Sequence, residues 1–236
     1  MTHIDKHLNL KKLAELCEHI KANLGVSCIN CTVAGRELVL TIRKQDVEDT
    51  LQFLRDDKKC QFKMLVDITG VDWSVAKHPD GRTERFDVVY HLLSTLYNQR
   101  IRVKLGVNED DSVPSVTELF SCANWYERET YDMFGIRFEG HPDLRRLLTD
   151  YDFQDFPLRK DFPLEGKVEV YYDENEKRVA YKPVDLPQEF RHFDWISPWE
   201  GITGNTDLAE EDNVFDAAEF EDDAGDIKDK TTKKSA

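Results

Sequence analysis

The order in which helical and strand-like hydrophobic patterns alternate along the chain as far as Val107 limits the possible folds more than any other feature. Apolar residues recur at helical spacing from Leu8 to Leu24, and Gly25 ends that pattern. A second helical pattern follows Asp46, which is suited to cap its N-terminus. Strand-like patterns cover Val26–Val33, Glu37–Ile42, Phe62–Val71, Arg85–Ser94 and Gln99–Val107. The order α-β-β-α-β-β-β predicts an α+β fold, a two-layer α/β domain with helices on one face of a mixed sheet.

Two more helices are predicted after a polar loop that begins at Asn108. The segment Val116–Cys122 has a helical pattern, with Ser115 placed to cap it. Asn124 is suited to cap the next helix, which Gly135 ends. We therefore expect a domain over residues 1–150 that includes this helix and the His-Pro loop behind it.

The character of the chain changes after residue 150. Prolines at positions 157, 163, 183, 187 and 198 exclude a long helix from residues 151–201. The segment is nevertheless rich in aromatic residues, and such an extended arm needs a surface on which to bury its rings. Its own domain would serve, but a partner subunit fits better. The aromatic residues are Phe153, Phe156, Phe162, Tyr171, Tyr172, Tyr181, Phe190, Phe193, Trp195 and Trp199.

Charge and hydropathy exclude several classes of function. The formal net charge is −15, and residues 202–236 alone hold eleven acids against four lysines. This last segment has the composition of a disordered tail, and so acidic a chain is a poor partner for nucleic acid. No apolar run is long enough for a membrane span, and the N-terminus lacks the features of a secretory signal. We expect a compartment equivalent to the cytosol or an organelle matrix.

The five cysteines are expected to be reduced thiols without a metal. The pair Cys28 and Cys31 forms a C-x-x-C, but the surrounding sequence indicates a strand. A spacing of three residues would place the two sulfurs on opposite faces of that strand. No second pair or nearby pair of histidines completes a zinc site, and no four thiolates are grouped for an iron–sulfur cluster. We therefore interpret them as half-buried strand residues.

Residues 127–148, ERETYDMFGIRFEGHPDLRRLL, hold the densest group of ionisable side chains. In a helix, Trp125, Arg128, Glu129 and Asp132 would form one stripe. Arg128 and Asp132 are then spaced to pair, whereas Glu129 and Asp132 repel each other unless a cation lies between them. Downstream, Arg137, His141, Arg145 and Arg146 add positive charge.

Three interpretations of this stretch compete. Glu129 and Asp132 are suited to act as a general acid and base, but no nucleophile, phosphate loop or oxyanion hole accompanies them. Glu129, Asp132 and His141 would supply three metal ligands, although the helical H-E-x-x-H and E-x-x-H patterns are absent. The third interpretation is an ion-pair network that either braces the helix against the His-Pro loop or crosses a subunit boundary. The residues alone favour the ion-pair network, and they do not decide whether its partners lie in this chain or in another subunit.

The stretch also resembles a known family. E-R-E-x-x-D-Met-Phe, six further residues, and then His141-x-x-x-Arg145-x-Leu147-Leu148 are similar to the signature of the thirty-kilodalton subunit of respiratory complex I. In bacteria this is the C subunit of the proton-pumping NADH:quinone oxidoreductase. Further likeness lies in Asp67–Asp72, Tyr90–Ser94 and Asp161–Gly166, so that it extends over roughly residues 40–200.

The resemblance implies a subunit that takes part in no catalytic chemistry of its own. It implies that FMN, the iron–sulfur clusters and quinone are all bound by partner subunits, and that this chain binds no cofactor and no metal. The expected partners are the forty-nine-kilodalton subunit (the D subunit), the N2-cluster subunit (the B subunit) and the 8 Fe–S subunit. Together they form a hetero-oligomer without direct membrane insertion by this chain. Its expected place is the cytoplasmic face of the bacterial inner membrane or the matrix side of the mitochondrial one.

The motif positions are assigned interface and bracing roles, with no catalytic residue. Our hypothesis is that Glu129, Asp132, Arg145 and Arg146 form the polar centre of the contact with the forty-nine-kilodalton subunit. Two alternatives are the corresponding subunit of a membrane-bound hydrogenase and a free-standing metal-assisted hydrolase. The complete set of motif positions is Glu127, Arg128, Glu129, Asp132, His141, Arg145, Arg146, Leu147 and Leu148.

Overall fold

The computed structural model describes residues 3–35, 37–150 and 152–187 of the 236-residue chain. The acidic tail expected over residues 202–236 and the last part of the expected arm lie outside these residues. The arm's aromatic residues Phe190, Phe193, Trp195 and Trp199 therefore lie outside them as well.

A five-stranded mixed sheet forms the centre of the domain, in the order β1-β2-β5-β4-β3. β2 and β5 run parallel, and the other neighbours are antiparallel. The expected strands are all present, two of them with the expected ends and three with ends that move by one or two residues. The bounds are β1 (Cys28–Ala34), β2 (Glu37–Ile42), β3 (Met64–Asp72), β4 (Phe86–Ser94) and β5 (Gln99–Val107).

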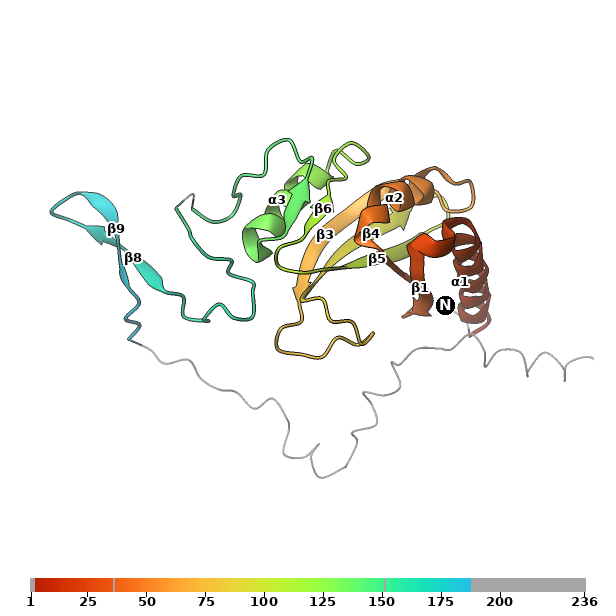
Figure 1. Cartoon of the computed structure of the whole chain (residues 1–236), viewed down its shortest axis with the longest axis horizontal. Helices are drawn as coiled ribbons and strands as arrows, with labels where there is room; N and C mark the ends of the chain where they lie inside the picture. The colour runs from red at the N-terminus through yellow and green to blue at the C-terminus, as the bar shows by residue number, and fades with distance from the viewer. Residues whose placement is uncertain (1–2, 36, 151, 188–236) are drawn as a thin grey trace, which may run out of the picture.

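Three helices cover one face of this sheet, namely α1 (His3–Leu24), α2 (Val47–Asp56) and α3 (Ala123–Phe134). α1 lies over β1 at one end and α3 lies over β3 at the other (Figure 1). Leu40, Val103 and Tyr90 are aligned across β2, β5 and β4, and all are fully buried in the single hydrophobic core. At the next register, Arg102 and His91 on the opposite face are only partly buried. The predicted two-layer α+β fold is confirmed.

The helix boundaries agree less well with the capping residues inferred from sequence. A 3₁₀ turn, η2 (Lys44–Asp46), precedes α2, and Asp46 holds the N-cap position without making a side-chain capping bond. α3 begins one residue before Asn124, at Ala123, so the prediction that Asn124 caps it is wrong. The chain enters α3 through a turn in which the Ala123 N–H already donates to the Phe120 carbonyl oxygen. Gly135 ends α3 in the left-handed conformation, as expected.

The short helix predicted over Val116–Cys122 is also wrong. A single turn forms there, in which the Phe120 N–H donates to the Val116 carbonyl oxygen at 2.9 Å, and it does not continue. The Ser115 hydroxyl and the Val116 N–H, which would begin a helix, both bind the carboxylate of Glu127 in α3. The polar groups that would begin the predicted helix therefore form hydrogen bonds with a side chain of α3.

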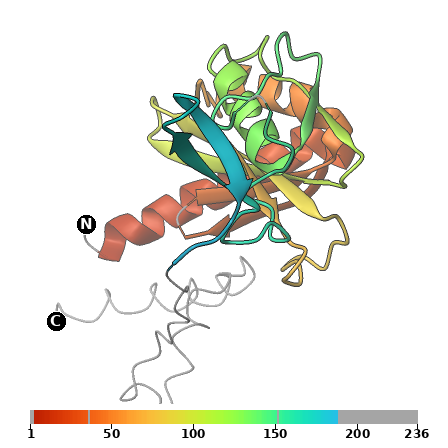
Figure 2. The same cartoon turned by 90° about the vertical axis from the view of Figure 1, so that its left-hand side faces the viewer.

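Two small sheets were not anticipated. One of them consists of β6 (Ser112–Pro114), which pairs in parallel with β7 (Arg137–Glu139) beside α3. Separately, a 3₁₀ turn, η1 (Gly25–Ser27), joins α1 to β1. Within the region expected to be an extended arm, β8 (Val168–Asp173) and β9 (Arg178–Pro183) form an antiparallel hairpin. Figure 1 shows this hairpin standing apart from the main domain, on the side where α3 lies, and in Figure 2, viewed from that side, the hairpin is in front of the domain.

Candidate functional site

Glu127 is a fully buried carboxylate on the inner side of α3. Its Oε1 accepts the backbone N–H of Val116 at 2.7 Å, and its Oε2 lies 2.6 Å from the Ser115 hydroxyl. Burial raises the pKa of Glu127 to about 7, against the opposing effect of these two hydrogen bonds. Glu127 thus ties the turn before α3 to the helix, and this turn is the segment for which the sequence predicts a helix.

Asp132, one and a half turns further along α3, is the second buried carboxylate. Its Oδ2 accepts the backbone N–H groups of Leu147, Leu148 and Thr149 at 3.0, 2.6 and 2.9 Å. Its Oδ1 accepts the Thr149 hydroxyl at 2.5 Å and lies 2.9 Å from Nη1 of Arg146. Burial alone would raise the pKa of Asp132, but the hydrogen bonds from Thr149, Leu148 and Leu147 outweigh it and hold the pKa at about 2.

Two further motif side chains bind the same loop through its backbone. Arg128 donates to the carbonyl oxygens of Arg145 and Arg146 at 3.1 and 3.2 Å, so its expected pairing with Asp132 is wrong. The ring of His141 lies with Nε2 3.1 Å from the Asn124 carbonyl oxygen and with Nδ1 accepting the Asp143 N–H at 3.0 Å. The His-Pro loop is therefore fastened to α3 at both of its ends.

The metal interpretation of the stretch finds no support in these contacts. Both nitrogens of His141 are occupied by backbone groups, Asp132 points inward, and Glu129 is exposed. Among the residues that the structure describes, one group of His, Cys and acidic side chains has the proximity of a metal site. It consists of His19, Asp57 and Cys60, far from this loop in the sequence. There, Oδ1 of Asp57 already lies within hydrogen-bonding distance of the His19 ring and of two backbone N–H groups.

The outer side of the same stretch is a surface with apolar and charged side chains. Trp125 and Leu148 are each 63% exposed, and the Arg145 side chain is 67% exposed. The Arg145 guanidinium pairs with Asp143, and Glu129 is on the exposed side of α3. The predicted stripe is therefore divided, because Asp132 faces the interior while Trp125 and Glu129 face solvent.

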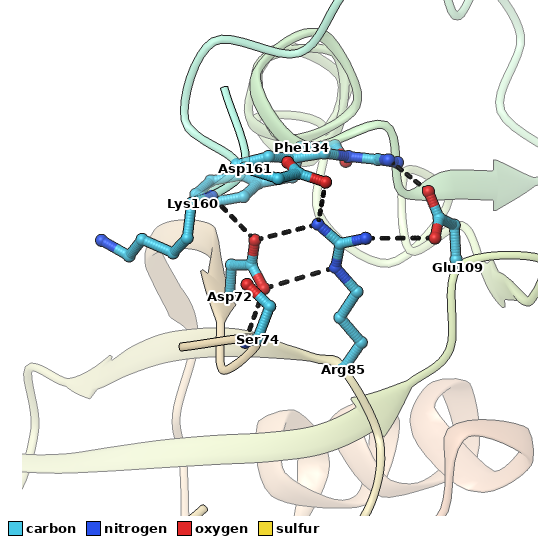
Figure 3. A network of polar contacts seen from close by, with 8 residues as sticks. Asp72, Ser74, Arg85, Glu109, Phe134, Lys160 and Asp161 are labelled. Atoms are coloured by element: carbon cyan, nitrogen blue, oxygen red, sulfur yellow. Dashed lines mark hydrogen bonds and ion pairs between the residues drawn. The ribbon is translucent and has the colours of Figure 1, made fainter. Parts of the chain in front are cut away.

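A second polar network seats the start of the arm against the sheet (Figure 3). Asp72, at the end of β3, accepts the backbone N–H of Lys160 at 2.9 Å. Arg85 lies between three acids, 3.3 Å from Asp72, 2.9 Å from Asp161 and 3.1 Å from Glu109. Burial alone would raise the pKa of Asp72, but the hydrogen bonds from Lys160 and Arg85 outweigh it and hold the pKa at about 2.

Arg159 and Phe156 extend this seat to the end of α3. Nε of Arg159 donates to the Phe134 carbonyl oxygen at 2.6 Å, and its guanidinium also pairs with Glu109. The same guanidinium lies 4.5 Å from the centre of the Phe156 ring, which contacts Tyr131 edge-on at 6.3 Å. The beginning of the arm therefore rests on its own domain, which was the less favoured of the two surfaces expected.

The hairpin beyond this seat presents apolar side chains to solvent. Val170 of β8 is 57% exposed and Val179 of β9 is 56% exposed. Tyr172 and Tyr181 are similarly exposed, although the Tyr181 hydroxyl donates to Asp150 at 3.1 Å. These side chains therefore form an uncovered apolar surface. It lies on a two-stranded hairpin, which by itself would be only marginally stable in water.

Comparison with known proteins identifies the family. A model described as "Respiratory-chain NADH dehydrogenase, 30 Kd subunit" matches residues 40–168, more than half of the chain. The match contains α3, the loop that Asp132 holds, and the seat of the arm. The chain belongs to this family. The resemblance inferred from the ERE signature is thereby confirmed.

Individual relatives agree with this assignment. The C subunit of the NADH-quinone oxidoreductase of Parvibaculum lavamentivorans is 56% identical over 191 residues, which cover 81% of this chain and 92% of that protein. The C subunit of the Rhodobacter capsulatus enzyme is 53% identical over 191 residues, 81% of this chain and 93% of that protein. A chain of the archaeal membrane-bound sulfane sulfur reductase has a similar fold, with a TM-score of 0.53 and 25% identity. That likeness covers 64% of this chain and 85% of the archaeal one.

The family assignment decides the broad function. The chain is the C subunit of a NADH:quinone oxidoreductase, complex I of the respiratory chain, and its family binds no cofactor itself. No helix in the described part of the chain is both long and apolar enough to cross a membrane. In this subunit the buried carboxylates of the signature hold a loop and a turn against α3.

Proposed function

We propose that the chain is a non-catalytic scaffold that docks on the forty-nine-kilodalton subunit (the D subunit) through two surfaces. One is the β8–β9 hairpin, and the other is the outer side of the signature stretch around Trp125, Glu129, Arg145 and Leu148. The N2-cluster subunit (the B subunit) and the 8 Fe–S subunit are the neighbours we assign to the same assembly. The complex then lies on the cytoplasmic face of the bacterial inner membrane, with FMN, iron–sulfur clusters and quinone in the partner subunits.

The exposed hairpin is the observation that carries this proposal. Val168, Val170 and Tyr172 lie on one side of β8, and Val179 and Tyr181 are exposed on β9. Burying such a side chain against a partner contributes roughly 1.5–3 kcal/mol of favourable free energy, which an isolated hairpin does not gain. A partner subunit of the hetero-oligomer is therefore the surface expected to cover them.

Two of the four charges expected at the polar centre of the signature are turned inward. Asp132 and Arg146 bind each other and the loop from inside, so they cannot face a partner while the loop keeps this conformation. Glu129 and Arg145 remain on the surface, and Trp125 and Leu148 are exposed as well. In the proposal the two surface charges contact the forty-nine-kilodalton subunit, and Glu127 and Asp132 fix the backbone that presents them.

The hairpin contact is tested with two exposed valines. Val170→Asp places a charge in the proposed interface, and Val75→Asp places the same charge in the loop between β3 and β4, where Val75 is 80% exposed. Both variants should fold, because neither valine lies in the core. Co-purification with the forty-nine-kilodalton subunit should be lost in Val170→Asp and kept in Val75→Asp. Equal recovery of the partner by both variants contradicts the hairpin contact.

The signature surface is tested by charge reversal. Arg145→Glu should abolish co-purification with the forty-nine-kilodalton subunit while the isolated domain stays folded by circular dichroism. Arg43→Glu, at an exposed position after β2, is the matched control and should assemble normally. If the Arg145→Glu complex assembles and only its turnover falls, the interface role of Arg145 is wrong.

A further inference from the structure

The C-x-x-C at residues 28–31 lies outside the two surfaces proposed above, and the fold brings a third thiol to it. The pairing of β1 with β2 contains a bulge between Cys28 and Asn30, so the simple alternation of faces is interrupted. Cys31 lies in the hydrophobic core and Cys28 packs against that core, which corrects the expectation that they lie on opposite faces. Cys17, on the inner side of α1, meets them there.

Cys17 and Cys31 are in unusually close contact. Their Sγ atoms are 2.7 Å apart, and Sγ of Cys17 also lies 3.2 Å from the Cys31 carbonyl oxygen. Non-bonded carbon atoms, which are smaller than sulfur, rest about 3.5–4.0 Å apart. A covalent S–S bond measures about 2.0 Å, so the two sulfurs are closer to bonding distance than to ordinary contact. The two sulfurs are therefore placed to react with each other.

The surroundings favour Cys17 as the nucleophile of the pair. The hydrogen bond with Cys31 and, after it, the charge of Lys21 lower the pKa of Cys17 against the opposite effect of burial. Lys21 lies one helical turn further along α1. The hydrogen bond with Cys17 and burial raise the pKa of Cys31, which therefore keeps its proton longer. Thiol–disulfide exchange begins with attack by a thiolate.

We propose that Cys17 and Cys31 are a redox pair that closes a reversible disulfide between α1 and β1. The oxidant is a low-molecular-weight disulfide. The Cys17 thiolate attacks one of its sulfurs and releases the first thiol, and Cys31 then loses its proton and attacks Sγ of Cys17. The second thiol leaves as the protein disulfide forms. Two electrons and two protons thereby pass from the pair to the small disulfide, which is reduced to two thiols.

The bond would fasten the first helix to an edge of the sheet. Cys17 and Cys31 are fourteen positions apart, and β1 is the outermost strand beneath α1. Closing a loop of this size restricts the unfolded chain, and we expect the unfolding temperature to rise by roughly 6–12 °C. Because both thiols are less than one-tenth exposed, oxidation requires α1 to separate briefly from β1 and is expected to be slow.

The first test maps the bonds in the full-length chain. The reduced protein is incubated with excess glutathione disulfide, its free thiols are alkylated, and peptides are analysed by mass spectrometry without reduction. A Cys17–Cys31 link, with Cys28, Cys60 and Cys122 still alkylated, supports the proposal. A link that includes Cys28, glutathione adducts without an internal bond, or five alkylated thiols would each overturn it.

The second test uses neighbours on the same strand. Cys31→Ala should lose the link and the temperature shift, whereas Cys28→Ala should keep both. Dithiothreitol should return the oxidised wild-type chain and Cys28→Ala to their reduced unfolding temperatures. If oxidation leaves the wild-type unfolding temperature unchanged, the pair does not fasten α1 to β1. Because bond mapping uses the wild-type chain, the conclusion stands even where a variant folds poorly.

Discussion

Arg146 and Asp132 lie 2.9 Å apart across fourteen residues of sequence, and the carboxylate is completely buried. The same carboxylate accepts three successive backbone N–H groups, from Leu147 to Thr149. A buried charge with this many donors is stabilised by its surroundings and costly to remove. Asp132 of the ERE signature therefore binds, from inside the domain, the loop that carries Arg145 and Leu148 to the surface.

We expect Asp132→Asn to lower the free energy of unfolding by about 3 kcal/mol at pH 7, because an amide nitrogen would face backbone donors. Glu129→Gln removes the same charge from the exposed side of α3 and should change stability by less than about 0.5 kcal/mol. Urea unfolding of both variants measures the difference. Equal losses would mean that the charge of α3 matters and the buried hydrogen bonds do not.

The acid side of the stability curve should depend on Asp132 and Asp72. The pKa of each carboxyl is about 2 in the folded chain, below its ordinary value of 3.8. A lowered pKa contributes stability that is present above pH 3.8 and is lost as the pH falls toward 2. Unfolding measured from pH 5 to pH 2 should show this loss in the wild-type chain. In Asp132→Asn the slope should be visibly smaller, and an unchanged slope contradicts the assignment.

Glu127 should act in the opposite direction and in a different pH range. Its folded pKa of about 7 lies above the ordinary 4.5, so its contribution is fully present below pH 4.5 and is lost as the pH rises through 7. Glu127→Gln keeps a neutral group able to bind Ser115 and Val116. Relative to wild type, this variant should gain on the order of 2–3 kcal/mol between pH 4.5 and pH 8. Glu129→Gln, which removes a carboxylate from the exposed side of α3, should show no such gain.

Local signals in the sequence predicted the central sheet and α3, but not the contacts that organise the site. The alternation of strands and helices and the stop at Gly135 are properties of short windows, and the structure follows them. The binding of Ser115 by Glu127 spans twelve residues, and the bond from Lys160 to Asp72 spans 88. Such pairs leave no periodic pattern. The isolated turn at Val116 shows the result, because a tertiary hydrogen bond overrides a plausible local cap.

Asp72 should control how firmly the arm is seated. Asp72→Asn weakens the bonds from the Lys160 N–H and from Arg85, so the segment around Arg159 should open more often. Trypsin cleavage after Arg159 or Lys160 should accelerate by about tenfold or more, which corresponds to a loss of about 1.4 kcal/mol. Asp67→Asn, on the same strand β3, is the control. Equal cleavage of the two variants would show that Asp72 does not hold the arm.

Alanine substitutions at two glycines distinguish the cost of backbone strain from the cost of displacing the arm. Gly135 and Gly140 both have left-handed backbone, with φ of 79° and 82°. A Cβ at Gly135 would lie 2.6 Å from Arg159 and 2.7 Å from Phe156, whereas a Cβ at Gly140 meets nothing within 4 Å. Alanine should therefore cost about 1–2 kcal/mol at Gly140 through conformation alone. At Gly135 it should cost about 1–3 kcal/mol more through overpacking.

Urea unfolding gives the two losses, and tryptic cleavage after Arg159 reports the seat directly. We expect faster cleavage in Gly135→Ala only, because the added methyl group displaces the side chains that rest against the end of α3. If the two variants lose equal stability and are cleaved equally fast, the side chains of the arm move away from the added methyl group without a cost in free energy. In that case the contacts of Arg159 and Phe156 would not position the arm.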